Sequence, residues 1–524
     1  MSTSNAVVSA DIQPTPGSIE YWAQQKPNTT AIIDGNRQLT YKQWNTYADA
    51  LAEGLVRQGI GPDDIIVTRL QIRYEWAIFA SAAAKIGCTI LGLNWRLTPS
   101  EVNYVLMNSG ATVVVCDDES PTALIPAFDG LPIKLRISMD VPAEGFVSYD
   151  ELLAADAPAL YSAGDARLII YTSGTTGLPK GVRNDVAPNF TAQQATEYYA
   201  SIGQSRKLNP GDVMLLTLPL HHAAGPANVG AALSNGNLLI MLRRFDAEET
   251  LRLIERHKVS YWTGVPTMFK RLKVLPEETL AKYDISSLNN LAIGAAPVPP
   301  SLKSWIREYF GEVLFESYGA TEVGMISDLS PEMQKIKPDS SGKPHRHVSI
   351  EIRDDDGRVL PANTPGEIWV RTPVTIRNYI NAPTLGTDTV DKDGFFRIGD
   401  AGHMDEDGFL FITDRTKDMI ISGGVNLYPA EIEAAIIQHD DVQDAAVIGI
   451  PDEEFGEKVL AFVELREGRN VSVEDLMSFT AGKLASYKCP KSIELCDSLP
   501  RNTMGKLLKR ELREPYWRNH TRRV

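Results

Sequence analysis

Cysteine is scarce in this chain, which has four cysteines in 524 residues. They are Cys88, Cys116, Cys489 and Cys496, and they form neither a CxxC pair nor a His/Cys spacing typical of zinc sites. A disulfide framework and a structural metal site are therefore not expected. We expect reduced thiols and a cytoplasmic location.

Long apolar runs are also missing. The longest run, from Ala77 to Leu93, is interrupted by Lys85 and contains Gly and Thr. It is too short and too polar to cross a bilayer, so we expect no membrane span. Met1 to Pro14 lacks a basic cluster followed by an apolar core, so no secretory signal is expected.

Positive charge is in deficit, with 52 Lys and Arg against 67 Asp and Glu and a net charge of -15. Such an acidic chain is not expected to bind nucleic acid or anionic lipid. Residues 501–524 differ, because they carry eight Lys or Arg against two Glu. This basic segment has two interpretations, a solvated tail or an edge that faces a phosphate.

The first half of the sequence shows alternating strand and helix patterns. Ile65 to Val67 and Thr112 to Val115 predict buried strands, and the stretches Tyr41–Leu55 and Trp76–Lys85 predict helices. This alternation predicts an α/β fold with mainly parallel sheets flanked by helices. The length alone indicates roughly three to four domains or subdomains.

The second half of the sequence shows a different pattern. From Val348 onward, short alternating strands such as Gly366 to Arg371 predict an antiparallel, β-barrel-like subdomain. After Asp418 a further unit begins, with predicted helices at Pro429–Ile437 and Val473–Leu484 around two strands. That α+β unit, of roughly 110 residues, is large enough to be a separate domain.

A glycine-rich loop follows the predicted strand at residues 168–170. It reads Tyr-Thr-Ser-Gly-Thr-Thr-Gly-Leu-Pro-Lys-Gly over residues 171–181. Glycine lets backbone N–H groups converge, and the hydroxyl groups add further donors, a combination that suits a polyphosphate. It is not a Walker A loop, since Gly181 stands where that motif needs Ser or Thr. If this loop is considered alone, the alternative is an ordinary surface turn rich in Gly, Ser and Thr.

Polar residues follow other predicted strands, where open α/β sheets carry their ligands. His221 and His222 come after the strand at 213–218. We favour a pocket wall or packing at a helix start for this pair, and keep His222 as a candidate catalytic base. Glu322 ends the polar segment that follows the apolar strand pattern at residues 313–315. Taken alone, it is more typical of a capping or solvated carboxylate than of a metal ligand.

Five motifs in a fixed order carry a family resemblance over essentially the whole chain. They are YTSGTTGLPKG, SYGATE, GFFRIGD, DRTKDMIISGGVNLYPAEIE and PRNTMGKLLKREL. With them the chain resembles the acyl-CoA synthetase branch of the adenylate-forming superfamily, which includes luciferases and peptide-synthetase adenylation domains. The resemblance implies that a carboxylate attacks the α-phosphate of ATP to give acyl-AMP and pyrophosphate. The thiol of coenzyme A (CoA) then displaces AMP.

The resemblance also implies a role for each motif residue. Glu322 would hold Mg²⁺, Thr321 would touch the α-phosphate, and Lys506 would bring positive charge to the α-phosphate and the attacking carboxylate. The residues implied for the β- and γ-phosphates are Thr172, Ser173, Gly174, Thr175, Thr176 and Lys180. Those implied for adenine and ribose are Gly294, Ala295, Ala296, Ser317, Tyr318, Gly319, Asp400, Ile412 and Arg415.

By the same resemblance, the chain has a large domain at 1–414, a hinge at 415–418 that includes Lys417, and a small mobile domain at 419–524. Gly423 and Gly424 would line the tunnel for the pantetheine arm of CoA. Cys489 stands where the family commonly has a basic residue. The positions that match CoA-binding residues of the family are Phe455, Tyr487 and Lys491.

The acid itself is expected to be hydrophobic and of moderate to large size. An amino-acid substrate needs a buried carboxylate for its ammonium group, and the stretches 221–227 and 263–266 contain no Asp or Glu. The expected pocket residues are His221, His222, Gly225, Thr263, Val265 and Gly319. A fatty acid is ranked slightly above an aryl, alicyclic or steroid-type acid. Several alternatives remain open: a carrier-protein thiol as acceptor, light emission in place of thiol transfer, an inactive binding homologue, and a homodimer.

Overall fold

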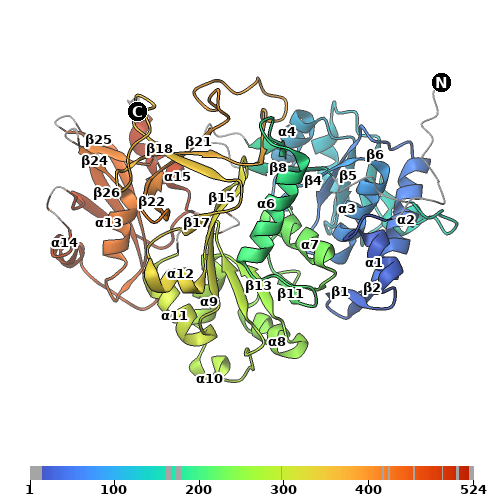
Figure 1. Cartoon of the computed structure of the whole chain (residues 1–524), viewed down its shortest axis with the longest axis horizontal. Helices are drawn as coiled ribbons and strands as arrows, with labels where there is room; N and C mark the ends of the chain where they lie inside the picture. The colour runs from blue at the N-terminus through green and yellow to red at the C-terminus, as the bar shows by residue number, and fades with distance from the viewer. Residues whose placement is uncertain are drawn as a thin grey trace.

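The computed structural model describes residues 14–160, 167–172, 179–296, 298–415, 418–422, 425–452, 455–484, 486, 488–502, 505 and 507–518. The N-terminal helices and strands lie at one end of the longest axis, and the C-terminal α+β unit lies at the other (Figure 1). The sheet that carries β11, β13 and β15 lies between them (Figure 1). The α/β fold expected from the sequence is confirmed.

In the described residues, a seven-stranded sheet has the order β7-β6-β5-β3-β4-β8-β9. All its neighbours are parallel except β8 and β9. Strands β4 and β5 are buried along their full lengths, as expected of parallel strands covered on both faces. The bounds are β3 (Ile65–Arg69), β4 (Thr89–Gly92), β5 (Val113–Cys116), β6 (Leu135–Ser138), β7 (Val147–Ser148), β8 (Arg167–Thr172) and β9 (Lys180–Val182).

Within the same described ranges, a nine-stranded sheet has the order β17-β16-β15-β14-β13-β11-β12-β1-β2. Its middle strands are parallel, and antiparallel pairs close both edges. The bounds are β1 (Thr30–Asp34), β2 (Arg37–Thr40), β11 (Val213–Leu216), β12 (Leu238–Met241), β13 (Tyr261–Gly264), β14 (Asn290–Ile293), β15 (Leu314–Ala320), β16 (Gly324–Leu329) and β17 (Lys343–Pro344).

The helices begin where the sequence supplies caps. Thr40 and Gln43 form a capping box at the start of one helix, and Asp246 caps another. The helices are α1 (Ile19–Gln25), α2 (Tyr41–Arg57), α3 (Tyr74–Ile86), α4 (Pro99–Ser109), the 3₁₀ helix η1 (Pro121–Phe128), α5 (Tyr149–Leu152), α6 (Ala192–Ser205), α7 (Ala224–Asn235), α8 (Ala247–His257), α9 (Pro266–Lys273), α10 (Glu277–Leu280), α11 (Pro300–Phe310), α12 (Pro331–Ile336), α13 (Pro429–Ile436), α14 (Val473–Ala481) and α15 (Lys509–Trp517).

Helix ends explain two of the element boundaries. Strand β13 begins only at Tyr261, because Lys258 ends α8 in the left-handed conformation and Val259 N–H still donates to Ile254 O. The helix expected to reach Leu484 ends at Ala481, where Gly482 is the C-cap.

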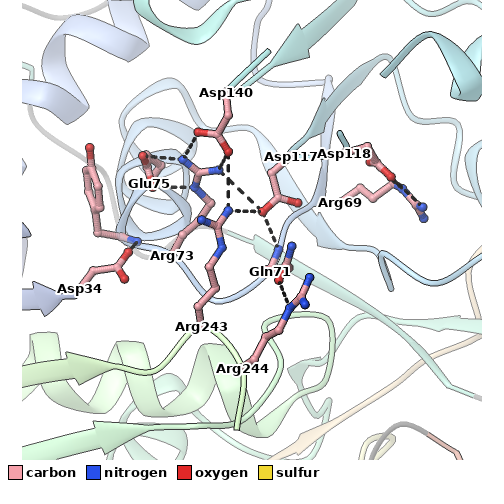
Figure 2. A network of polar contacts seen from close by, with 11 residues as sticks. Asp34, Arg69, Gln71, Arg73, Glu75, Asp117, Asp118, Asp140, Arg243 and Arg244 are labelled. Carbon is pink, nitrogen blue, oxygen red and sulfur yellow. Dashed lines mark hydrogen bonds and ion pairs between the residues drawn. The ribbon is translucent and has the colours of Figure 1, made fainter. Parts of the chain in front are cut away.

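One apolar core joins the two large sheets. It includes Ile66 and Val115 of the seven-stranded sheet, Leu215 and Ile240 of the nine-stranded sheet, and Phe79 of α3. A network of charged side chains also joins them (Figure 2). Arg243, after β12, donates to Asp117, after β5, at 3.0 Å. The two sheets therefore share both a core and a polar seam.

The remaining strands are mostly antiparallel. The four-stranded sheet β18-β19-β21-β22 is the subdomain expected after Val348, and β10 pairs with β20. The C-terminal strands bury core clusters made only of residues beyond 419. The bounds are β10 (Asp185–Val186), β18 (Ser349–Arg353), β19 (Gly366–Arg371), β20 (Val374–Thr375), β21 (Phe396–Met404), β22 (Leu410–Arg415), β23 (Ile420–Ser422), β24 (Val425–Leu427), β25 (Val442–Asp452), β26 (Gly456–Leu465) and β27 (Ser492–Cys496). None of the described helices is long and apolar enough to cross a membrane.

Candidate active site

The carboxyl ends of the parallel strands open onto one continuous cleft. Strand ends from both large sheets contribute to it. Residues of β21 and the chain near residue 502 also line it. This is the position expected for a ligand in an open α/β sheet. The predicted residues that line the cleft are Thr172, Lys180, His221, His222, Thr263, Val265, Gly294, Ala295, Ala296, Ser317, Tyr318, Gly319, Thr321, Glu322, Asp400 and Ile412.

The glycine-rich loop connects β8 to β9. Thr172 pairs with Lys180 across the base of the loop, so the two ends are held together. Lys180 Nζ lies 4.8 Å from the ring centroid of Tyr379. Four of the predicted phosphate-binding residues lie outside the described residues: Ser173, Gly174, Thr175 and Thr176.

Glu322 is held from two directions. Its backbone carbonyl accepts the N–H of Ile376 at 3.0 Å, and its Oε1 accepts the hydroxyl of Tyr379 at 3.1 Å. Burial, and then the charge of Glu322, raise the pKa of Tyr379, so its phenol stays protonated and donates. Tyr379 therefore links Lys180 to Glu322, a contact for which the sequence offered no motif.

Tyr318 and Asp400 meet across the cleft. The Tyr318 hydroxyl donates to Asp400 Oδ2 at 2.5 Å, and Asp400 is 9% exposed. Both strands shift register beside these residues, between Tyr318 and Gly319 in β15 and between Ala401 and Gly402 in β21. Such irregularities re-aim side chains at functional sites.

The stretch Gly294 to Ala296 packs tightly against β15. A Cβ on Gly294 would lie 2.9 Å from the carbonyl oxygen of Ser317, so this position excludes any side chain. Ala295 has a φ of 67°, a conformation that costs a non-glycine residue about 1–3 kcal/mol. The Ser317 hydroxyl accepts a bond from Arg206 at 2.9 Å. The backbone that would face adenine is thus fixed from behind.

Arg415 pairs with Asp400 through the backbone, since the two residues are partners in the β21–β22 ladder. The side chain of Arg415 lies outside the described part of the structure. Thr321 is also held through its backbone, because its carbonyl accepts the side-chain amide of Asn184 at 2.9 Å. Like Tyr379, Asn184 was not predicted, because it lies 137 residues away in the chain.

His221 and His222 form part of the cleft wall, with ring centroids 4.5 Å apart. His221 is 5% exposed, and neither of its ring nitrogens has a hydrogen-bond partner among the described residues. Burial, then His222 and Arg96, lower the pKa of His221 to about 3. Burial lowers the pKa of His222 to about 4. Both rings are therefore neutral at pH 7, which fits a pocket wall.

Of the residues predicted for the acid pocket, all but Gly225 line the cleft. A Cβ on Gly225 would lie 2.3 Å from Pro219 O, and one on Gly319 would lie 2.6 Å from Gly324 O, so both glycines are required by packing. Thr263 Oγ1 bonds to the side-chain oxygen of Asn228 at 3.1 Å. Val265 is buried and directly precedes α9.

The small-domain residues expected to bind CoA are only partly placed. Phe455 is 46% exposed and Lys491 is also exposed. Five predicted residues lie outside the described part of the chain: Lys417, Gly423, Gly424, Tyr487 and Lys506. Arg501 and Asn502, whose roles the sequence did not suggest, line the cleft.

Comparison with known families agrees with this geometry. A model described as AMP-binding enzyme matches residues 19–380, and one described as AMP-binding enzyme C-terminal domain matches residues 431–506. The chain belongs to this family. It is an adenylate-forming enzyme, as the resemblance predicted.

Curated relatives and solved structures cover nearly the whole chain. The long-chain-fatty-acid–CoA ligase FadD13 of Mycobacterium tuberculosis is 35% identical, over 94% of this chain and 97% of that protein. The fatty acid–[acyl-carrier-protein] ligase ScoC of Streptomyces coeruleorubidus is 32% identical, over 96% of each. The o-succinylbenzoate CoA synthetase (MenE) of Bacillus subtilis, in complex with the acyl-adenylate intermediate OSB-AMP, is 30% identical. That structure aligns with a TM-score of 0.83 over 96% of this chain and 98% of its own.

Proposed function

We propose that this enzyme joins a hydrophobic carboxylic acid to CoA at the expense of ATP. In the first half-reaction a carboxylate oxygen attacks the α-phosphorus of ATP, forming acyl-AMP and releasing pyrophosphate. In the second, the thiol sulfur of CoA attacks the acyl carbon and AMP leaves. The intermediate is needed because a free carboxylate has oxide as its leaving group, whereas AMP leaves readily.

The observation that carries this proposal is the gathering of five distant segments on one cleft. Lys180, Glu322, Asp400, His222 and Asn502 come from different elements, yet all line it. The cleft therefore combines cationic and carboxylate groups with an apolar wall. A ligase that must hold ATP beside a hydrophobic acid needs this combination.

Positioning and charge compensation account for most catalysis of phosphoryl transfer. In our proposal Lys180 and the loop of β8–β9 hold the β- and γ-phosphates, while Thr321 and Lys506 serve the α-phosphate. Asp400 accepts both ribose hydroxyls, a geometry that one carboxylate can satisfy. Tyr318 already donates to Asp400, which fixes the carboxylate for that task.

Glu322 fits a magnesium ligand, because hard carboxylate oxygens on a partly accessible side chain suit an ion shared with phosphates. There Glu322 would hold the ion that accompanies ATP, which neutralises phosphate charge when bound. Tyr379 holds one oxygen of that carboxylate in place.

For thiol transfer we propose a large domain at 1–414, a hinge at 415–418 and a small domain at 419–524. The small domain would present Phe455 and Lys491 to CoA once the hinge at Lys417 turns. The acceptor is free CoA in this proposal. A carrier-protein thiol is the second candidate, because ScoC is named for that reaction.

The acid is proposed to be a fatty acid or a similarly bulky acid without charge on its body. Support comes from the two neutral histidines and from the absence of Asp and Glu at 221–227 and 263–266. A small acid such as acetate would forgo about 0.8 kcal/mol for each methylene that it lacks. An amino acid would leave its ammonium unpaired against this wall.

The test is a pyrophosphate-release assay with acetate, octanoate, a cinnamate, a bile-type acid and phenylalanine. Each acid is run with ATP alone, with CoA, and with a phosphopantetheinylated carrier protein. We expect the highest kcat/KM for octanoate, or for a ring acid, and turnover with CoA. Preference for acetate or phenylalanine would overturn the acid assignment, and turnover with the carrier alone would overturn the acceptor.

A further inference from the structure

The small domain is held against α9 by a cluster of charges that belongs to both domains. Lys270 Nζ, on α9 of the large domain, donates to Asp444 Oδ2 at 2.6 Å. Arg501, of the small domain, donates to the same oxygen. Asp444 Oδ1 accepts the N–H of Ala445 at 2.9 Å, so both carboxylate oxygens are engaged.

The local backbone favours this arrangement. The β25–β26 ladder shifts register between Val442 and Asp444, an irregularity that turns a strand side chain away from its regular direction. The Asp444 side chain is 12% exposed and that of Lys270 is 24% exposed. A carboxylate so far from water is destabilised when it loses a cation, because nearby solvent cannot replace the partner.

Arg501 connects this cluster to the loop that ends in Lys506. Its Nη1 donates to the carbonyl of Gly505 at 2.7 Å, and Gly505 directly precedes Lys506 in the sequence. Arg501 also forms a backbone bridge with Leu507. The guanidinium thus holds Asp444 with one nitrogen and the loop with another.

The same loop touches α9 directly. Gly505 has a φ of 73°, and a Cβ there would lie 2.4 Å from the methyl group of Thr267. Thr267 and Lys270 are three residues apart on α9 and so share one face. One face of α9 therefore contacts both Gly505, through Thr267, and Asp444, through Lys270.

We infer that Lys270, Asp444 and Arg501 are positioning residues for acid activation, and that they hold the small domain in the pose that serves this half-reaction. Lys270 is the only member of the three on the large domain, so its bond to Asp444 must break when the small domain turns. Asp444 and Arg501 stay together after the turn. The inference rests on the proposed role of Lys506.

The experiment separates the two half-reactions. Acid activation is measured as single-turnover pyrophosphate release, and thiol transfer as consumption of synthetic acyl-AMP by CoA. Lys270→Met is expected to slow activation by a factor of about 5–30, as the loss of one or two kcal/mol of pose stability predicts. Thiol transfer should stay within about twofold, because that pose does not use the bond.

Controls distinguish a pose effect from a folding defect. Lys270→Arg should restore activation, since a guanidinium can donate to the same oxygen. Lys258→Met removes a bond to Asp284 that lies within the large domain, so it should leave both half-reactions unchanged. Asp444→Asn should slow activation more than Lys270→Met does, because Arg501 loses its partner too.

Equal slowing of both half-reactions by Lys270→Met, or no slowing of activation, would overturn the inference. Lys506→Ala is run in parallel. If that variant still forms acyl-AMP at the parent rate, the role proposed for Lys506 fails, whatever the Lys270 variants do.

Discussion

The phenol of Tyr379 contacts two groups from separate elements, Lys180 at the start of β9 and Glu322 in the turn between β15 and β16. Its ring lies beside Lys180 and its hydroxyl donates to Glu322. A bond to a charged carboxylate contributes more than one between neutral groups, about 1.5–3 kcal/mol. The hydroxyl should therefore fix the carboxylate that is proposed to meet the metal–nucleotide complex.

Tyr379→Phe keeps the ring beside Lys180 and removes only the hydroxyl. We expect kcat/KM for magnesium-ATP to fall about tenfold, which corresponds to about 1.4 kcal/mol, with the KM for the acid unchanged. Tyr309→Phe is the matched control, since that hydroxyl bonds to Leu280 O away from the cleft. A Tyr379→Phe enzyme with the parent dependence on magnesium would contradict the role.

The depressed pKa of His221 predicts a pH dependence of stability. Its folded pKa is about 3, well below the ordinary value of 6.5, so the unfolded chain binds more protons between these values. The contribution is complete above pH 6.5 and is lost as the pH falls. Between pH 8 and pH 5 this one ring should cost about 2 kcal/mol of unfolding free energy.

Urea unfolding of the parent and of His221→Phe at pH 8 and pH 5 tests this. The variant should lose less stability on acidification, because phenylalanine does not titrate. Identical losses in both proteins would show that His221 is protonated as easily in the folded state as in the unfolded one.

Individual residues were predicted unevenly from the sequence. Lys180 and Asp400 could be placed at the cleft because each belongs to a motif that carries the family resemblance. Tyr379 could not, because it lies 57 residues from Glu322 and no local pattern pairs the two. Lys270 could not for the same reason, since 174 residues separate it from Asp444. Contacts between residues far apart in the chain produce no periodic pattern in the sequence.

At the scale of elements, the end of β4 and the loop after β11 are in direct contact. A Cβ on Gly92 would lie 2.5 Å from Leu220 O and 2.7 Å from the Cα of His221. The seven-stranded sheet therefore positions the loop that carries both histidines. Strands and helices were predictable from periodicity, but this close approach between two elements was not.

Gly92→Ala should displace that loop, because both clashing atoms belong to backbone. Overpacking of this kind costs about 1–3 kcal/mol, and we expect acid turnover to fall along with the unfolding midpoint. Gly203→Ala on α6 is the control, since nothing lies within 4 Å of its Cβ position. That substitution should raise stability by about 0.5–1 kcal/mol. A Gly92→Ala enzyme with parent acid kinetics would contradict the contact.

For the whole molecule, the sequence indicated the α/β class and the change to antiparallel strands, because period and composition report each element separately. It did not indicate how the two large sheets meet. That junction depends on Asp117, whose side chain is 2% exposed and accepts from Arg243 across the seam (Figure 2). Asp117 Oδ2 also accepts the N–H of Gln71 at 3.2 Å.

Asp117→Asn should loosen the seam, because a neutral amide cannot compensate Arg243 and Arg73, which lies 3.7 Å away. Arg243 is 45% exposed and also lies 3.6 Å from Asp140, so the loss of this charge-assisted hydrogen bond should cost about 1.5–3 kcal/mol. We expect a lower urea midpoint for the unfolding of the two-sheet region, measured by tryptophan fluorescence. Glu332→Gln is the control, since its pair with Lys207 is more than half exposed and should contribute less than about 1 kcal/mol. Equal midpoints for the two variants would mean that the apolar core alone joins the sheets.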